Sequence, residues 1–173
     1  ADDCNIFFKA TNLNVSAVVN SSLEMLSNWF ACNQLALNTT KTNYMIFSGR
    51  RRFQVDNISI NGTDIHKVSQ CRFLGIVLDD KLSWRPHIQF ALRKISRSIG
   101  ILRKVNRHLS RNFMLQLYNS FILPYLQYGI TAWGSPSKTS VNSLFLYQKK
   151  AFKVALNVPT RTSTTEIFEN TKF

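Results

Sequence analysis

The chain has 173 residues, and 45% of them are hydrophobic, which is enough apolar material for a folded core and excludes a largely disordered chain. Its 22 lysines and arginines outnumber nine acidic residues and give a formal net charge of +13. A surface of one sign repels itself unless an anionic partner neutralises it. A polyanion such as nucleic acid is therefore the expected partner. A basic surface without a partner and an anionic membrane are the alternatives.

The first half of the chain has the pattern of mixed strands and one helix. Residues 4–8 form an apolar run that predicts a short strand, and residues 15–35 repeat apolar side chains at helical spacing. Residues 44–47 predict a second strand. In residues 58–65 an Asn-Gly pair predicts the tight turn of a hairpin. Residues 68–78, whose centre is almost wholly apolar, predict a further strand.

The second half has the pattern of a helical bundle. From Trp84 onward, apolar residues recur every three or four positions, so we predict a helix that Ser83 caps and whose first turn holds Pro86. Ser110 is expected to cap the next helix, which Pro124 should break or kink. Helices are also predicted over residues 125–133 and 140–157. The fold class is therefore α+β, with a change of character near residue 80.

The positive charge is concentrated in this second half. Fourteen basic residues and no acidic ones lie between Asp80 and Glu166. Arg93, Arg97, Lys104 and Arg107 fall opposite the apolar side of the predicted helix. A charged side is often only the solvated face of a helix, but a face of one sign forgoes stabilising ion pairs. We therefore expect sequence-independent, salt-sensitive contacts to a phosphate backbone. The basic loop of residues 50–52 is either a second backbone contact or a bare loop.

Several other chemistries are not predicted. The three cysteines are far apart and form no C-x-x-C pair, which indicates a reduced, intracellular protein without a zinc site. The three histidines are equally scattered, so no catalytic histidine is expected. Residues 112–137 carry no charge, but polar residues and Pro124 interrupt them, which favours buried helices over a membrane span. Trp84 and Trp133 are expected to pack in the core.

Asp2 and Asp3 are the candidate metal ligands. Adjacent carboxylates supply the hard oxygen atoms that Mg²⁺ prefers, and two such ions can drive nucleotidyl transfer. The alternative is an ordinary exposed acidic turn. The context favours the metal site, because Ala1-Asp2-Asp3 is followed at once by the apolar residues 4–8.

Four segments in order resemble the reverse transcriptases of jockey-like non-LTR retrotransposons. The first residues resemble their aromatic-Ala-Asp-Asp motif, without the aromatic residue. Residues 29–42 are similar to the pattern W-x-x-x-N-x-L-x-L-N-x-x-K-T, and residues 73–79 are similar to the F-L-G primer-grip segment. Residues 123–129 and 132–134 resemble the region that follows. Each motif is loose by itself, but four in this order and spacing are specific.

The resemblance implies a partial palm domain over residues 1–80, with short antiparallel strands, a helix and a primer-grip hairpin. It implies an all-helical thumb over residues 81–173. It implies an RNA-directed DNA polymerase that binds two Mg²⁺ ions, an RNA template with a DNA primer, and deoxynucleoside triphosphates. Asp2 and Asp3 would be the catalytic metal ligands, and Lys41 a proton donor or phosphate contact. A solvated lysine in a turn is the alternative for Lys41. Phe73, Leu74 and Gly75 would position the primer end, although an ordinary buried strand is the alternative for them.

The chain is expected to be a fragment, because it starts inside a motif and lacks the further carboxylate and the fingers that such polymerases need. The isolated chain is therefore predicted not to polymerise. The alternatives are a non-catalytic nucleic-acid-binding module and a decayed piece that binds nothing. An intracellular location, in nucleus and cytoplasm, is expected, and the sequence leaves the oligomeric state open.

Overall fold

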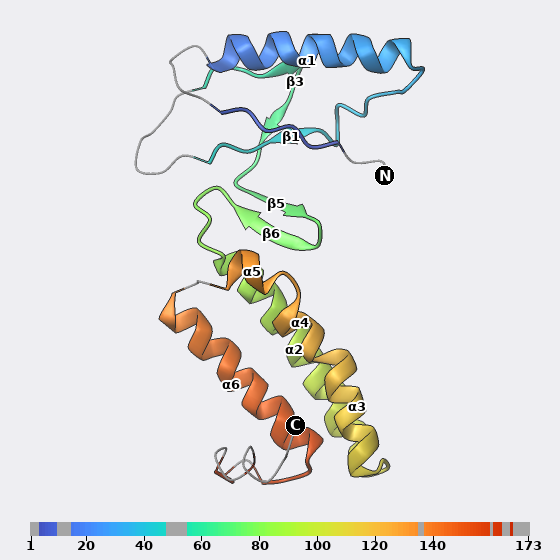
Figure 1. Ribbon diagram of the computed structural model, residues 1–173, viewed down its shortest axis with the longest axis vertical. Coiled ribbons are helices and arrows are strands. Elements are labelled where there is room, and N and C mark those ends of the chain that lie inside the picture. Colours follow the sequence, from blue (N-terminus) through green and yellow to red (C-terminus); the bar gives the residue numbers. More distant parts are fainter. Residues whose placement is uncertain are drawn as a thin grey trace. The chain divides into compact units, whose positions relative to one another are not determined.

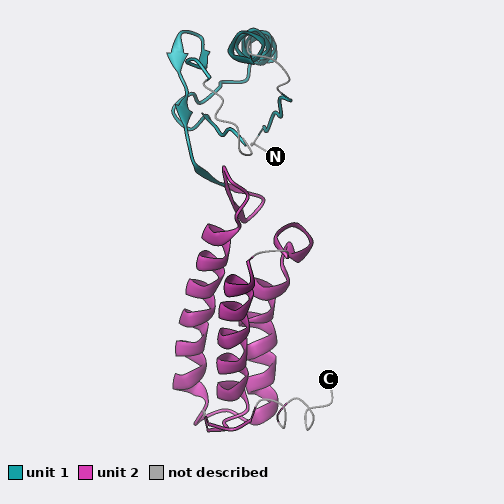
Figure 2. Ribbon diagram, turned by 90° about the vertical axis from the view of Figure 1, so that its left-hand side faces the viewer, with its two compact units in different colours: residues 1–71 teal, residues 72–173 magenta. Residues whose placement is uncertain are grey.

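A computed structural model of the chain describes residues 4–9, 15–47, 55–134, 137–159, 161–163 and 167. The chain divides into two compact units, Ala1–Cys71 and Arg72–Phe173, hereafter unit 1 and unit 2 (Figure 2). The division falls ahead of the predicted change near residue 80. The segment that resembles a primer grip, residues 73–79, therefore belongs to the helical unit rather than to the mixed one.

Unit 1 is built on one helix and a tight hairpin. Helix α1 (Val15–Cys32) packs on strand β2 (Ser59–Ile60), which pairs antiparallel with β3 (Thr63–Asp64) (Figure 1). The predicted Asn-Gly turn is confirmed, since both of its residues have positive φ. The helix that the spacing of residues 15–35 predicted is confirmed over Val15–Cys32. The core of this unit is small and consists of Val19, Leu23, Ile58, Ile60 and Ile65.

Polar side chains of α1 complete the packing on the hairpin. The Asn20 side chain accepts a hydrogen bond from the Ser59 amide and donates one to the Asn57 carbonyl, both at 3.2 Å. About two helical turns further along α1, the Ser27 hydroxyl donates a hydrogen bond to Oδ1 of Asn61 at 2.9 Å. The helix thus satisfies the Ser59 amide of β2 and the Asn57 carbonyl just before the strand.

Two predictions in unit 1 need correction. Residues 4–9 belong to no strand, although their composition suggested one, because a strand needs a neighbouring strand to receive its backbone hydrogen bonds. The strand expected over residues 44–47 is only β1 (Asn43–Tyr44), and it pairs with β4 (His66–Lys67). That pairing is parallel, whereas short antiparallel strands were expected.

Unit 2 begins with a hairpin where one continuous strand was predicted over residues 68–78. Strand β5 (Gln70–Phe73) pairs with β6 (Ile76–Asp79), and the chain reverses at Leu74 and Gly75. Both turn residues have positive φ, 46° and 82°. The apolar run hid this turn, because leucine is a rare residue in the left-handed region.

Three long helices and two short ones follow among the described residues of unit 2. They are α2 (Arg85–Val105), α3 (Arg111–Phe121), α4 (Leu123–Gln127), α5 (Ile130–Trp133) and α6 (Lys138–Ala155). Pro124 lies in the first turn of α4 and separates it from α3, as predicted. The single helix expected over residues 125–133 is instead split at Gly129, whose φ is 64°. The α+β fold class is confirmed.

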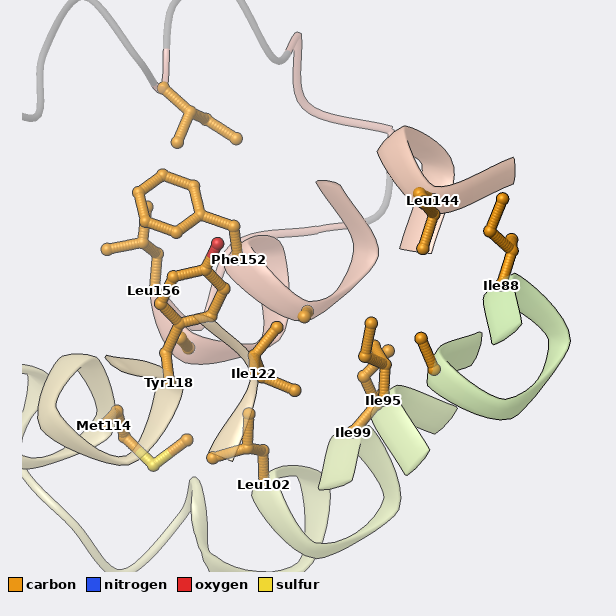
Figure 3. Close-up of a cluster of buried hydrophobic side chains, with 14 of the residues drawn as sticks. Ile88, Ile95, Ile99, Leu102, Met114, Tyr118, Ile122, Leu144, Phe152 and Leu156 are labelled. Carbon is orange, nitrogen blue, oxygen red and sulfur yellow. The ribbon is translucent and has the colours of Figure 1, made fainter. Parts of the chain in front are cut away.

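The core of unit 2 lies between α2, α3 and α6, which pack against one another (Figure 2). Figure 3 shows side chains of the three helices converging, with the rings of Tyr118 and Phe152 edge to face at 5.3 Å between centroids. Ile95, Leu102 and Ile122 are completely buried. Trp133 is buried and Trp84 is half-buried against this core, which confirms the prediction for both tryptophans.

The predicted cap of α2 is present only in part: the Ser83 hydroxyl accepts a hydrogen bond from the Arg85 amide at 3.4 Å, but Ser83 does not directly precede the helix. The residue before the helix is Trp84, in a left-handed conformation, and the Asp79 carboxylate accepts hydrogen bonds from the amides of Ser83 and Trp84 at 3.1 and 3.0 Å. Burial raises the pKa of this carboxyl, but hydrogen bonds from Ser83, Trp84 and Lys81 outweigh burial and hold the pKa below its usual range. Asp79 therefore joins β6 to α2.

None of the helices described here combines the length and the apolar character that crossing a bilayer requires.

Candidate nucleic-acid interface

The basic residues of α2 form a stripe along its exposed side. Arg93, Arg97 and Lys104 are exposed, and on an ideal helix they lie within about 40° of one another. Arg107 is exposed in the turn that follows α2. The opposite side of the helix carries Ile88, Ala91, Ile95, Ile99 and Leu102, all buried. The predicted division of α2 into a basic face and an apolar face is thus confirmed.

The centre of this stripe is a residue without a side chain. Gly100 lies between Arg97 and Lys104 on the same line of the helix, about 20° from Arg93. A Cβ added at this position would meet nothing within 4 Å, so packing does not explain the glycine. The middle of the stripe therefore has no side chain above the helix backbone, and cationic side chains lie on either side of it.

Several other cations of unit 2 make cation–π contacts with aromatic rings. The Arg72 guanidinium and the Lys94 ammonium lie 5.3 and 5.6 Å from the ring centroid of Phe90. On α6 the Lys149 ammonium lies 4.0 Å from the centroid of Phe145, which is itself exposed. Such contacts hold the cations near the surface while they remain available to anions.

The turn of the β5–β6 hairpin lies in the same unit as the stripe. Phe73 is half-buried, whereas Leu74 is 73% exposed at the turn. The hairpin packs on α2, and His87 of α2 accepts a hydrogen bond through Nδ1 from the Val77 amide at 3.3 Å. The structure thus brings the predicted primer-grip residues and the predicted backbone contacts into one unit.

Lys41 belongs to unit 1, in a turn that Asn38 organises. The side-chain oxygen of Asn38 accepts hydrogen bonds from the Thr40 hydroxyl at 2.7 Å and from the Lys41 amide at 3.2 Å. Its carbonyl accepts from the amide and the hydroxyl of Thr42. The Asn-x-x-Lys-Thr spacing is therefore that of a hydrogen-bonded turn, and it leaves the Lys41 side chain exposed.

Asp2 and Asp3 lie outside the described residues, and so do the arginines of residues 50–52. Among the residues that the structure describes, no group of three or more His, Cys, Asp or Glu could hold a metal ion. The metal site thus stays a prediction from the sequence.

The sequence did not predict the side chains that support the hairpin turn. Tyr128 donates a hydrogen bond from its hydroxyl to the Leu74 carbonyl at 2.7 Å, and Trp133 and His87 lie behind it. Only the position of Tyr128 within an apparent family motif marked it. Its partner is 54 positions away in sequence, and such a pairing needs the tertiary structure.

Known proteins with sequences similar to this chain are polymerases of mobile elements. Over 99% of its length the chain is 27% identical to the RNA-directed DNA polymerase from mobile element jockey of Drosophila melanogaster. It is 26% identical over 92% of its length to the probable RNA-directed DNA polymerase from transposon BS of the same species. The chain is similar to a segment of non-LTR reverse transcriptases. The predicted resemblance is confirmed.

The similarity extends to a second group of retrotransposon proteins. A segment of 114 residues is 32% identical to the retrovirus-related Pol polyprotein from the type-1 retrotransposable element R1 of Bradysia coprophila. The chain spans only about a fifth of the jockey and BS polymerases. No protein-family model matches the chain, and no solved structure does either.

Proposed function

We propose that this chain is the part of an RNA-directed DNA polymerase that holds the primer–template duplex during retrotransposition. The similarity over nearly the whole chain to polymerases of jockey and BS supports the proposal. The exposed basic stripe of α2 is the observation that carries it, because Arg93, Arg97, Lys104 and Arg107 present one sign of charge on a rigid helix. Residues 81–173 would be the thumb, and residues 1–80, which include the β5–β6 hairpin, would be the end of the palm.

The catalytic part of the proposal rests on the sequence. Asp2 and Asp3 would hold two Mg²⁺ ions in the intact polymerase, and Lys41 would contact the leaving pyrophosphate. The ions would activate the primer hydroxyl and stabilise the leaving group. Deoxynucleoside triphosphates would be the substrates. Phe73, Leu74 and Gly75 would position the primer end. The intracellular location remains a prediction.

The duplex-holding role predicts a definite salt dependence. Binding of an RNA–DNA primer–template to the chain is expected to weaken as salt rises, because each phosphate contact releases about one counterion. Replacing Arg93, Arg97, Lys104 and Arg107 together by glutamine should reduce the slope of log K against log salt by about 3 to 4. Fluorescence anisotropy over a salt series measures both slopes.

A matched control removes the same charge elsewhere. Lys9, Lys67, Lys138 and Arg161 are exposed and lie off α2. Their joint replacement by glutamine changes the net charge equally and should leave most of the slope in place. Equal losses in the two variants would mean diffuse attraction rather than a stripe. A wild-type chain that binds no duplex at low salt would refute the proposed function altogether.

Catalysis provides the second test. The isolated chain is expected to show no primer extension with Mg²⁺ and deoxynucleoside triphosphates. Its predicted metal ligands are Asp2 and Asp3, and the metal site of such a polymerase needs a further carboxylate. Primer extension by the isolated chain would show that the chain alone is sufficient for polymerisation and would contradict this prediction.

A further inference from the structure

The turn of the β5–β6 hairpin is strained and exposed at the same place. Leu74 has a φ of 46°, a left-handed conformation that is unfavourable for a residue with a Cβ. Its apolar side chain is nevertheless 73% exposed. Neither feature helps the isolated fold, so other contacts must hold the turn in this shape.

Tyr128 supplies those contacts. It lies at the end of α4, and its hydroxyl donates a hydrogen bond to the Leu74 carbonyl at 2.7 Å. The same ring lies close against the other turn residue, since a Cβ added at Gly75 would be 3.3 Å from Cε1 of Tyr128. One side chain thus fixes both residues of the turn.

Tyr128 is in turn held from behind by α5. The indole Nε1 of Trp133 donates a hydrogen bond to the Tyr128 carbonyl at 2.7 Å. The next residue, Gly129, has a φ of 64° and lies against the hairpin, because a Cβ there would be 2.5 Å from Cδ1 of Ile76. The glycine allows the α4–α5 connection to approach β6.

The support returns to the hairpin through α2. The ring of His87 lies 5.2 Å from that of Trp133, and its Nδ1 accepts a hydrogen bond from the Val77 amide at 3.3 Å. Burial lowers the pKa of His87, which favours the neutral imidazole that an accepting Nδ1 requires. Tyr128, Trp133 and His87 therefore form a closed set of contacts, hereafter the clamp, that begins and ends on the β5–β6 hairpin.

We propose that Tyr128 is a positioning residue that fixes the Leu74–Gly75 turn against the terminal nucleotide of the primer. The inference rests on the proposed function and adds the residue that holds the contact in place. Leu74 offers an apolar surface that suits the face of a terminal sugar or base. Arg72, exposed on β5 and held over Phe90, offers a cation to the adjoining phosphate.

The test compares two duplexes of equal length, one with a recessed primer 3′ end and one continuous. The wild-type chain should prefer the recessed end, and a photoreactive 3′-terminal nucleotide should crosslink to the Leu74 turn. Tyr128→Phe removes only the hydroxyl, so it should reduce the preference and the crosslinking by about 3- to 10-fold, the value of one hydrogen bond. The salt slope and the thermal midpoint should stay as in the wild type.

Two further variants separate positioning from folding. Leu74→Asn places a residue that tolerates positive φ at the turn, so it should keep or raise the stability while it removes the apolar contact and the end preference. Tyr125→Phe is the matched control on α4, because none of the described residues provides a hydrogen-bond partner for its hydroxyl. It should change neither the preference nor the crosslink.

The outcomes distinguish this inference from the proposed function. A Tyr128→Phe variant with unchanged preference and crosslinking would overturn the inference, as would one that loses stability and all duplex binding together. A wild-type chain that binds duplex with a strong salt slope but shows no preference for the 3′ end would also overturn the inference. That result would leave the proposed backbone contacts of α2 intact. Absence of salt-dependent binding would instead refute the proposed function.

Discussion

The two units of the chain achieve their order by different means. Unit 2 buries apolar side chains from three long helices, with Ile95 and Leu102 wholly inaccessible. Unit 1 has a far smaller core and strands of two residues, and polar side chains such as Asn20 and Ser27 join its helix to its hairpin. Short strands without wide sheets are marginal by themselves. The basic stripe of α2 therefore has a rigid support that unit 1 does not offer.

The exposed surfaces of the two units differ in kind as well. On α1 the exposed side carries Val18, Met25 and Trp29, which are more than half exposed. On α2 the exposed side carries arginine and lysine. A helix with apolar side chains on its outer face gains less from folding in water than an amphipathic one. The contrast predicts that substitutions will be felt unequally in the two units.

The largest difference is expected from the cores. Ile95→Ala removes a completely buried side chain from unit 2 and should lower its free energy of unfolding by about 3 kcal/mol. Val19→Ala, the smaller deletion in unit 1, should cost roughly 1 to 2 kcal/mol. Hydrogen exchange read separately for each unit measures both. Equal losses in the two units would contradict the difference in their cores.

A smaller effect is expected from the polar side chains that join elements. Asp79→Asn weakens the two amide hydrogen bonds that start α2 and should cost about 1 to 2 kcal/mol at neutral pH. Because the pKa of Asp79 is lowered in the fold, its contribution is complete above its ordinary value of 3.8 and is lost as the pH falls through the lowered value. The variant should therefore lose part of the acid sensitivity of unit 2.

Asn20→Ala is the corresponding change in unit 1, since it removes a side chain that both accepts from and donates to the hairpin. Denaturation curves of both variants between neutral and acid pH make the comparison. If the Asp79→Asn variant lost stability with falling pH as the wild type does, protonation of Asp79 would not contribute to the acid sensitivity of unit 2.

The smallest effect concerns the middle of the basic stripe. Gly100→Ala should stabilise unit 2 by roughly 0.5 to 1 kcal/mol, because alanine is the better helix former and the added methyl meets nothing. Thermal unfolding monitored by circular dichroism measures the gain. A loss of stability would mean that the glycine has a packing role in the fold.

Much of the site could be read in the sequence because its chemistry is local. The positions of Arg93, Arg97 and Lys104 on one face follow from helical periodicity alone, and the Asn-Gly turn follows from two residues. The run around Leu74 was misjudged for the same reason. Its composition is that of a strand, and the forces that turn the chain there come from Tyr128 and Gly129, far away in sequence.

The sequence by itself determined the class of fold, the basic helix and the similarity to retrotransposon polymerases, since composition, periodicity and motif order are properties of neighbouring residues. Only the tertiary structure decided that Trp84 rather than Ser83 directly precedes α2, that Asp79 accepts hydrogen bonds from the two amides leading into the helix, and that residues 73–79 belong with the helices. It alone placed the clamp behind the Leu74 turn. Hydrogen bonds between distant residues form only once packing has brought them together, and no local pattern encodes them.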